Sequence, residues 1–451
     1  MTPVIDAAAL VEPLRQFLPR QRWYSGTDAP SSVVVEDSRV LDRGWPALVD
    51  LIVDADGARY QVPVGLRPSG ERPDFLRGHD GAVVGEVGGN DGPLLAYDAV
   101  LDPVLGLSLL DVVSGSKESA DRVRPVGGEQ SNSSLVYDDR LILKVFRRIH
   151  SGRNLDVEMT AALSEAGFEH VARPLATLTV HDDDLAVLQP FLVGGSDGWA
   201  LALTSLRDLF GVGDTQPVPV ISADMAVPAA VDPAMAGGDF SAEAFRLGRI
   251  TAQMHRALAE AFGRSAGDTG VWADIVEAQV EAEAHPQFDR AAAKGVLAAL
   301  RGVSDAGPAI RLHGDYHLGQ VMRTDAGWYV LDFEGEPARP PEERRRPSSP
   351  LRDVAGMLRS FHYASLVAQL DRHEECGDLA AAWEERNRGE FLKGYRKTAA
   401  TAGLVADPAA TEVVLAAFEL EKAVYELGYE RAYRPDWQSI PLAALQRLGA
   451  R

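Results

Sequence analysis

Asp315 and Gln320 stand five residues apart in the segment Arg311–Gln320, and Asp332 closes the apolar run that follows. Carboxylates and an amide in this order suit the transfer of a phosphoryl group from Mg-ATP to a hydroxyl group. Asp315 would orient that hydroxyl and accept its proton, whereas Gln320 and Asp332 would offer oxygen ligands to the magnesium ion. Protein kinases space a catalytic Asp, an Asn and a metal-binding Asp similarly, with Asn where this chain has Gln. The segment predicts a kinase that acts on a small molecule.

Glu334 extends the predicted metal site, since it stands two residues after Asp332, where protein kinases have glycine. It could hold a second magnesium ion or face solvent. We expect His313 to brace the loop through a backbone hydrogen bond, while His317 could contact the substrate or be structural. A zinc site on these two histidines is a poor fit, because no further ligand pattern accompanies them.

The nucleotide needs its own contacts, and a lysine inside an apolar strand, Lys144 within Leu141–Phe146, is the main candidate. In a kinase such a lysine contacts the ATP phosphates and an acid on the next helix, for which Glu158 is the most plausible partner. Upstream lies a stretch of small and hydroxyl-bearing residues that lacks the full G-x-G-x-x-G pattern. The further candidates from this stretch and from the segment expected beside the adenine are Gln130, Ser131, Asn132, Ser133, Gln189, Phe191 and Leu192.

Apolar periodicity predicts the elements that must position these side chains. Residues 1–90 should open with an amphipathic helix through Leu10, Leu14 and Leu18. Strands are expected at 32–35, 46–53 and 58–64, and a glycine-rich loop at 85–92. Residues 91–200 should begin with a mostly helical stretch at 94–114. They should continue with strands 134–137 and 141–146 around a hairpin turn, a helix at 156–166 and a strand at 184–191.

Residues 201–451 are expected to be mainly helical around the catalytic loop and its strands. The segment Gly213–Gly238, dense in Pro, Gly, Ala and Val, should be a loop or insertion, and 340–350 an exposed loop. The expected helices are 242–262, 274–284, 291–301, 353–370, 384–399 and 412–429. Strand, strand, helix, strand followed by helices predicts an α+β fold with the order of a kinase small lobe and a helical large lobe.

Composition excludes several classes of protein. The 451 residues include 45 basic and 66 acidic side chains, a formal charge of -21, which argues against nucleic acid or an anionic membrane as a partner. The single cysteine, Cys376, excludes an intramolecular disulfide and a multi-cysteine zinc site. The N-terminus has no basic n-region, and no uninterrupted apolar stretch could cross a bilayer. We therefore expect a cytoplasmic enzyme.

Across nearly its whole length the chain resembles the actinobacterial maltokinases, relatives of the aminoglycoside and choline kinases with a eukaryotic-protein-kinase-like fold. The matching stretches are Arg20–Tyr24, Glu129–Ser133, Ile142–Arg148, His313–Gln320, Asp332–Glu336, Pro350–Gly356 and Glu419–Glu426. The resemblance implies a bilobal fold with an N-terminal cap subdomain (1–90), an intermediate subdomain with the nucleotide loop (91–200) and a helical C-lobe (201–451). It also implies ATP-dependent formation of maltose 1-phosphate, feeding α-1,4-glucan (glycogen) synthesis, and favours metal binding by Glu334.

The expected helix 412–429 contains the candidate residues for substrate binding. Glu419, Lys422 and Glu426 recur at spacings of three or four and share one face with Tyr429, beside Tyr425. A solvated, salt-bridged face would explain this pattern equally well, and the resemblance favours a sugar pocket. Trp437 could then serve as a platform for a sugar ring.

Two alternatives remain open. The acceptor could be glucosamine, another sugar or an aminoglycoside, although a cationic acceptor would want an uncompensated acid, and Lys422 lies between two acids. The chain could instead be a catalytically silent binding module, against which the presence of Lys144, Asp315 and Asp332 counts. We expect a monomer with ATP, magnesium and a small sugar as its ligands, and association with another glycan-pathway enzyme stays open.

Overall fold

The computed structural model describes residues 7–71, 73–89, 92–127, 132–215, 239–336, 339–370 and 376–449. The chain divides into two compact units, residues 1–161 with 172–193 and residues 162–171 with 194–451. None of the helices within the described ranges is long and apolar enough to cross a membrane.

The first unit opens with an antiparallel sheet in the order β1-β2-β3-β5-β4. Its strands are β1 (Val33–Asp42), β2 (Ala47–Ala55), β3 (Ala58–Pro68), β4 (Val83–Gly89) and β5 (Gly92–Asp98). Helix α1 (Val11–Phe17) places the buried side chains of Leu14 and Phe17 in one core with the sheet. The predicted N-terminal helix and first three strands are confirmed, because their apolar residues recur at the period of each element.

Two predictions in this region are wrong. Within the expected glycine-rich loop at 85–92, residues 85–89 belong to β4, which pairs with β5 and buries Val87, and residues 90 and 91 lie outside the described residues. The expected helical stretch at 94–114 begins as β5, and helix α2 spans only Pro103–Ser114. Asp102 decides where α2 begins: its carboxylate accepts a hydrogen bond from the Val104 amide, and Pro103 takes the first helical position.

The second sheet of this unit has the order β10-β11-β8-β7-β6. Its strands are β6 (Val123–Pro125), β7 (Asn132–Tyr137), β8 (Leu141–Phe146), β10 (Ala176–Val180) and β11 (Asp183–Pro190), and the short β9 (Arg148–Ile149) pairs with β3 of the first sheet. Asp138 and Asp139, at φ 49° and 52°, form the predicted turn between β7 and β8. Helix α3 (Leu155–Glu165) confirms the helix expected there.

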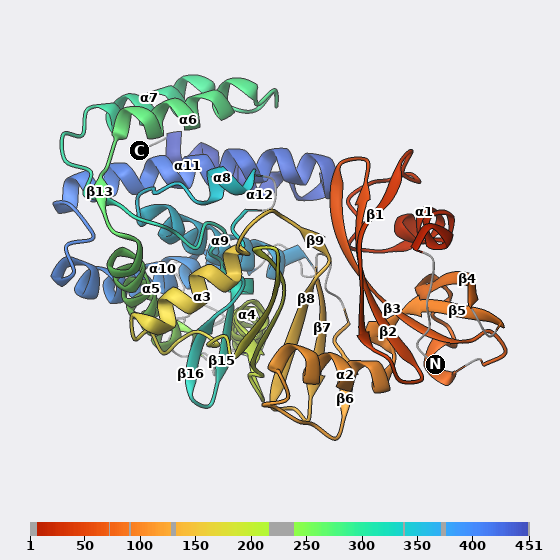
Figure 1. Ribbon diagram of the computed structural model, residues 1–451. Coiled ribbons are helices and arrows are strands. Elements are labelled where there is room, and N and C mark those ends of the chain that lie inside the picture. Colours follow the sequence, from red (N-terminus) through yellow and green to blue (C-terminus); the bar gives the residue numbers. More distant parts are fainter. Residues whose placement is uncertain are drawn as a thin grey trace, which may run out of the picture. The chain divides into compact units, whose positions relative to one another are not determined.

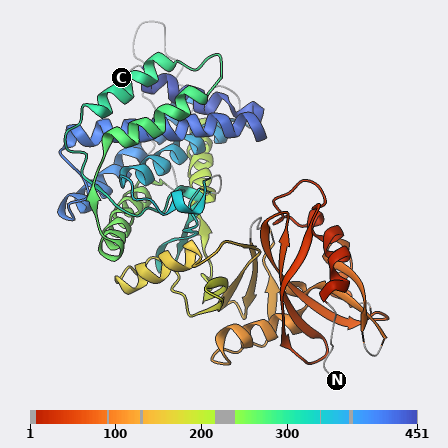
Figure 2. The same cartoon turned by 45° about the horizontal axis from the view of Figure 1, so that its top comes forward.

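The second unit is mainly helical, and its helices are coloured from yellow-green to blue in Figures 1 and 2. They are α4 (Gly198–Thr215), α5 (Ser241–Phe262), α6 (Thr269–Ala282), α7 (Arg290–Arg301), α8 (Pro341–Arg344), α9 (Leu351–Leu370), α10 (Gly377–Thr401), α11 (Pro408–Tyr433) and α12 (Ser439–Gly449). The six predicted helices are confirmed. Residues 216–238, most of the expected loop or insertion, lie outside the described residues, and residues 213–215 belong to α4.

The segment 340–350 is only partly the exposed loop that was expected. It contains the short helix α8, and Ser348 and Ser349 are buried. Ser348 pairs through its backbone with Ile310, just before the catalytic loop. The polar composition of the segment gave no indication of this backbone pairing.

Close packing of α5 against α10 supports this unit. A Cβ atom on Gly248 would lie 2.0 Å from the Phe391 carbonyl oxygen, and one on Gly394 would lie 2.2 Å from the Phe245 carbonyl oxygen. Only glycine fits at such a backbone approach, so these two positions allow the helices to touch. A small sheet consists of β12 (Ser196–Asp197), β15 (Val321–Thr324) and β16 (Gly327–Val330). Because Val321 pairs with Val330, the loop before β15 and the motif after β16 lie at the same end of this sheet.

Candidate active site

Asp353, at the start of α9, anchors the loop that carries Asp315. Its carboxylate accepts hydrogen bonds from the backbone amides of His313 (2.9 Å) and Gly314 (3.0 Å) and from His255 Nε2 of α5 (3.1 Å). Burial favours the neutral carboxyl, but the hydrogen bonds and His255 outweigh burial and lower the pKa of Asp353. This buried carboxylate therefore holds the loop in place.

A second set of bonds joins the loop to the strand that ends in Asp332. His313 Nε2 donates to the Leu331 carbonyl oxygen at 2.8 Å, which confirms the bracing role predicted for this histidine. The Leu331 amide donates to the Gln320 carbonyl oxygen at 2.9 Å. One hydrogen bond from a side chain and one between backbone groups thus hold the loop and the strand end together.

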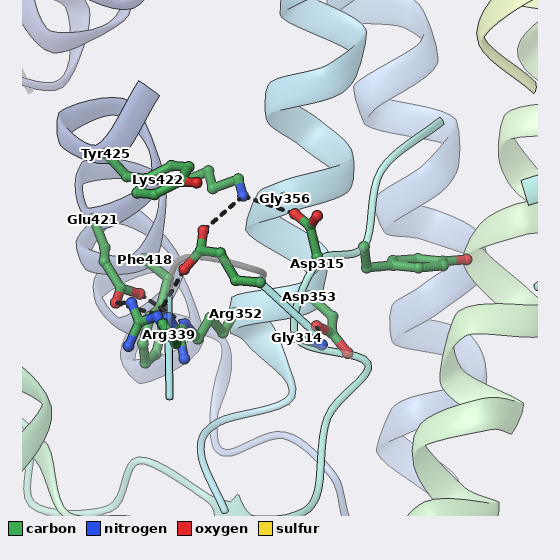
Figure 3. A pocket seen from close by; sticks show the side chains of 12 residues that line it. Gly314, Asp315, Arg339, Arg352, Asp353, Gly356, Phe418, Glu421, Lys422 and Tyr425 are labelled. Atoms are coloured by element: carbon green, nitrogen blue, oxygen red, sulfur yellow. Dashed lines mark hydrogen bonds and ion pairs between the residues drawn. The ribbon is translucent and has the colours of Figure 1, made fainter. Parts of the chain in front are cut away.

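Lys422 of α11 makes the central contact of the site. Its ammonium lies 3.1 Å from Asp315 Oδ1 and 3.1 Å from Glu336 Oε1, as the dashed lines in Figure 3 show. Burial opposes the charged forms of both Asp315 and Lys422, but their mutual attraction prevails: the pKa of Asp315 is lowered and that of Lys422 is raised. Asp315 is therefore an anion at neutral pH, as a group that aligns a hydroxyl should be.

Besides Asp353, three carboxylates and three cations line this pocket and alternate. They are Asp315, Lys422, Glu336, Arg339, Glu421 and Arg352. Arg339 lies 2.7 Å from Glu336 and 2.9 Å from Glu421, and Arg352 lies 2.9 Å from Glu421. Each acid in this set has a cation within hydrogen-bonding distance, so the charges of the set balance. The sequence analysis did not predict a role for Glu336. Its position at the end of the matching stretch Asp332–Glu336 was the signal that could have identified it.

Some of the residues predicted to bind substrate line the pocket, and others form ion pairs between helices. Lys422 and Tyr425 line the pocket. Glu419 pairs with Arg388 of α10, and Glu426 lies 2.6 Å from Arg359 of α9, so their carboxylates tie helices together. The face of α11 is therefore salt-bridged, as the alternative interpretation of the sequence held, but these ion pairs are largely buried rather than solvated.

His317 and Trp437 were also predicted to contact the substrate. His317 Nε2 is 3.9 Å from Asp315 Oδ2, while His317 Nδ1 accepts a hydrogen bond from the Gly319 amide at 3.0 Å. Trp437 lies under the Arg434 guanidinium, whose Cζ is 4.4 Å from the ring centroid. The substrate-binding roles of both residues stay predictions.

Gln320 and Asp332, two of the predicted metal ligands, lie next to one another. Gln320 Nε2 lies 3.2 Å from Asp332 Oδ2, so the amide and the carboxylate face one another. Asp332 adopts φ 59°, a left-handed conformation that few residues other than glycine, Asn and Asp accept. Within the described ranges no group of three or more His, Cys, Asp or Glu side chains could hold a metal ion. One amide and one carboxylate nevertheless fit Mg²⁺, which keeps several water or phosphate ligands. The role of Glu334 stays a prediction.

In the first unit, Lys144 on β8 pairs with an acid of α3. That acid is Asp156, whose Oδ2 lies 3.1 Å from the ammonium. The sequence suggested Glu158 instead, and any nucleotide-binding role for Glu158 stays a prediction. Asp156 is almost fully buried, so its charge needs the lysine as a partner.

The other residues predicted to contact the nucleotide make different hydrogen bonds within the protein or lie outside the described residues. Gln130 and Ser131 lie outside the described residues. Ser133 Oγ accepts a hydrogen bond from Arg147 Nε at 2.8 Å, and Gln189 Nε2 donates to the Ala172 carbonyl oxygen at 2.9 Å. Phe191 donates its backbone amide to the Arg140 carbonyl oxygen at 2.9 Å. Contacts of Asn132, Phe191 and Leu192 with a nucleotide stay predictions.

Comparison with known proteins assigns the family. The model of the Phosphotransferase enzyme family matches residues 122–385, more than half of the chain. This protein belongs to the phosphotransferase enzyme family. The Maltokinase N-terminal cap domain matches residues 17–102 of this phosphotransferase. The predicted maltokinase-like architecture, a cap on a protein-kinase-like fold, is thereby confirmed.

The relatives of this phosphotransferase include two curated glucosamine kinases. The one from Streptacidiphilus jiangxiensis is 27% identical over 435 residues, covering 91% of this chain and 90% of that protein. The one from Mycolicibacterium smegmatis is 28% identical over 358 residues, covering 75% and 82%. A solved structure of glucosamine kinase in complex with glucosamine, ADP and inorganic phosphate matches with a TM-score of 0.65 at 22% identity, over 93% of this chain and 94% of that one. At this identity the structural match supports the fold alone.

Proposed function

We propose that this phosphotransferase is a sugar kinase that transfers the γ-phosphoryl group of ATP to a hydroxyl of a neutral sugar. Maltose is the first candidate, with its anomeric hydroxyl as the acceptor. The observation that carries the proposal is the contact of Lys422 with both Asp315 and Glu336. The product, maltose 1-phosphate, would be a donor for α-1,4-glucan synthesis.

Asp315 would act on the acceptor. As an anion it accepts a hydrogen bond from the sugar hydroxyl and turns the hydroxyl oxygen toward the γ-phosphorus, and it takes the proton as the new bond forms. A carboxylate with a lowered pKa is a weak base, which suits a loose transition state in which the proton leaves late. Most of the rate enhancement would therefore come from positioning and from fixed charges.

Lys144, held by Asp156, would contact the ATP phosphates. Gln320 and Asp332 would hold Mg²⁺, and Glu334 would assist. When bound, the metal ion neutralises charge on the phosphate oxygens. The remaining work falls to the side chains of the chain itself, which orient the acceptor and stabilise the transferring group.

Charge supports the choice of a neutral acceptor. Glucosamine carries an ammonium group near neutral pH, and burying it would require a carboxylate without a cation. Asp315, Glu336 and Glu421 each already contact a lysine or an arginine. An ammonium group would have to displace Lys422 or remain uncompensated, and either is costly.

Glucosamine is nevertheless the second candidate, because the two curated relatives are glucosamine kinases. An identity below one third leaves room for a different acceptor. The charges of the pocket therefore favour a neutral sugar, whereas the similarity to glucosamine kinases favours glucosamine. A direct assay must decide between the two acceptors.

The test is ADP release with Mg-ATP and each of maltose, glucose, glucosamine, trehalose and an aminoglycoside, with the product located by phosphorus NMR. We expect maltose-dependent turnover and a phosphate on the anomeric carbon. Turnover of glucosamine alone would overturn the neutral acceptor and retain the sugar kinase. Binding of Mg-ATP without turnover of any acceptor would support the silent binding module instead.

A further inference from the structure

The segment Asp332–Glu336, which we call the metal motif, turns sharply after β16. Asp332 adopts φ 59° and Gly335 adopts φ 74°, so two left-handed conformations stand within four residues. The turn also lies against the catalytic loop, because a Cβ atom on Gly314 would be 3.4 Å from the Cα atom of Gly335. A residue other than glycine keeps a left-handed conformation where the surrounding structure holds it there. The motif therefore needs support from residues outside it.

Arg344, the last residue of α8, contacts this turn. Its Nη1 donates to the Glu334 carbonyl oxygen at 3.2 Å, and its Nε donates to the Arg339 carbonyl oxygen at 2.7 Å. The methylene carbons of the same side chain cover Gly335, since a Cβ atom there would lie 3.4 Å from both Cβ and Cδ of Arg344. One side chain thus binds the backbone before and after Glu336 and packs on the glycine between.

The base of this side chain is itself held in place. The Arg344 amide donates to the Pro340 carbonyl oxygen at 3.2 Å. Four residues later, Ser348 exchanges two backbone hydrogen bonds of 2.9 Å with Ile310, just before the catalytic loop. Arg344 is partly buried, whereas Arg346 in the same segment is exposed. A side chain fixed at its base loses less conformational freedom when it forms its hydrogen bonds.

The chemistry of arginine suits this position. A guanidinium carries five N–H donors in one plane and stays charged at every physiological pH, so it can bind two carbonyl oxygens at once. Hydrogen bonds from a charged donor are also stronger than those between neutral groups. Residues that orient the ligands of a metal ion matter for its affinity, and their loss typically weakens metal binding about 10–100-fold.

We propose that Arg344 is a positioning residue for the metal site. By holding the Glu334 carbonyl oxygen and covering Gly335, it keeps the turn in the conformation that presents the carboxylates of Asp332 and Glu334 to Mg²⁺. The assignment of these two carboxylates to Mg²⁺ rests on the proposed function. Arg344 acts through the backbone of the motif and not on the acceptor.

The test measures binding of Mn²⁺ to the ADP complex of the full chain by electron paramagnetic resonance, and the Mg²⁺ dependence of sugar turnover. Arg344→Met keeps an apolar stem over Gly335 and removes both hydrogen bonds. Arg344→Lys keeps the charge and a donor. Arg346→Met is the matched control, because that side chain is exposed and only two positions away.

We expect the Kd for Mn²⁺ and the Mg²⁺ concentration for half-maximal turnover to rise about tenfold in Arg344→Met, equal to about 1.4 kcal/mol. The KM for the sugar should change by less than about twofold, because the acceptor contacts are untouched. Arg344→Lys should show an intermediate rise of about threefold, since an ammonium lacks the planar fork. Arg346→Met should stay within about twofold of the wild type.

The outcomes separate this inference from the proposed function. Weaker Mn²⁺ binding in Arg344→Met supports it even where no sugar is phosphorylated, and then only the proposed function fails. Sugar turnover with the wild-type dependence on Mg²⁺ in this variant overturns the inference and leaves the kinase proposal intact.

Two further results would also overturn the role of Arg344. One is a loss of unfolding free energy in Arg344→Met with unchanged affinity for Mn²⁺, because the residue would then support the fold alone. The other is a wild type that binds no Mn²⁺. Where Arg344→Met does not fold, Arg344→Lys decides: a Kd for Mn²⁺ about threefold above that of the wild type supports the inference, and an unchanged Kd overturns it.

Discussion

Replacing Lys422 by methionine is the sharpest test of the site, because the change removes one charge and keeps the length of the side chain. The ammonium has two carboxylate partners at 3.1 Å, and the exposed fractions are 22% for Lys422, 21% for Asp315 and 5% for Glu336. Lys422→Met leaves two largely buried carboxylates without the cation between them. Breaking a buried pair costs about 3–5 kcal/mol, and partial exposure of Asp315 places the expected loss of unfolding free energy near the lower figure.

The catalytic effect follows from the same contact. Without Lys422 the pKa of Asp315 must rise, so a smaller fraction of Asp315 is ionised at any given acidic pH. The acidic limb of the pH profile of kcat/KM should therefore move to higher pH in the variant. Asp315 would also lose the partner that fixes its position, and a displacement of about 1 Å can cost about a hundredfold in rate.

The assay combines urea unfolding with pH profiles of kcat/KM for the sugar that the wild type phosphorylates. The matched control is Lys393→Met, because Lys393 is a surface lysine, 67% exposed, whose partner Glu390 is on the same helix. That change should alter stability by less than about 0.5 kcal/mol and leave the pH profile in place. An unmoved acidic limb in Lys422→Met, with a stability loss no larger than that of the control, would refute the assignment of Lys422.

Three further perturbations test other parts of the molecule. Asp315→Asn should keep ATP binding and lose about three or more orders of magnitude in kcat, measured by ADP release, and near-normal turnover would remove Asp315 from its role. Asp156→Asn should increase KM for ATP by a factor about ten times larger than the factor for KM of the sugar, because Lys144 loses its partner. Equal factors for ATP and sugar would contradict the pairing of Lys144 with Asp156. Burial raises the pKa of Asp50 to about 6, so the stability it contributes is complete below its ordinary value of 3.8 and is lost as pH rises through 6. The unfolding free energy of the wild type relative to Asp50→Asn should therefore fall by up to about 3 kcal/mol between pH 4 and pH 7 in urea unfolding, and a difference independent of pH would contradict the raised pKa.

Much of the chemistry could be predicted from the chain because it depends on local spacing. Asp315, Gln320 and Asp332 lie within 18 positions of one another, and the short strands between them bring them together. The helices of the second unit could be predicted for a similar reason, since their apolar residues recur at helical spacing. The strand β4 could not, because glycines interrupt its alternation and only pairing with β5 stabilises it.

The partners of the catalytic residues depended on contacts far apart in the chain. Lys422 is 107 residues from Asp315, and Asp353 is 40 residues from the His313 amide it accepts from. No local periodicity encodes such pairs. The sequence favoured Glu158 as the partner of Lys144, and the packing of α3 placed the neighbouring acid Asp156 beside β8 instead.

The sequence by itself predicted the kind of reaction, a set of candidate residues for it and most of the helices, because these depend on residue type and short spacing. Only the tertiary structure decided which charges meet. It made the face of α11 a buried set of ion pairs and made Lys422 the partner of Asp315. The physical reason is that the energy of a charge depends on what surrounds it, and those surroundings come from helices distant in the chain.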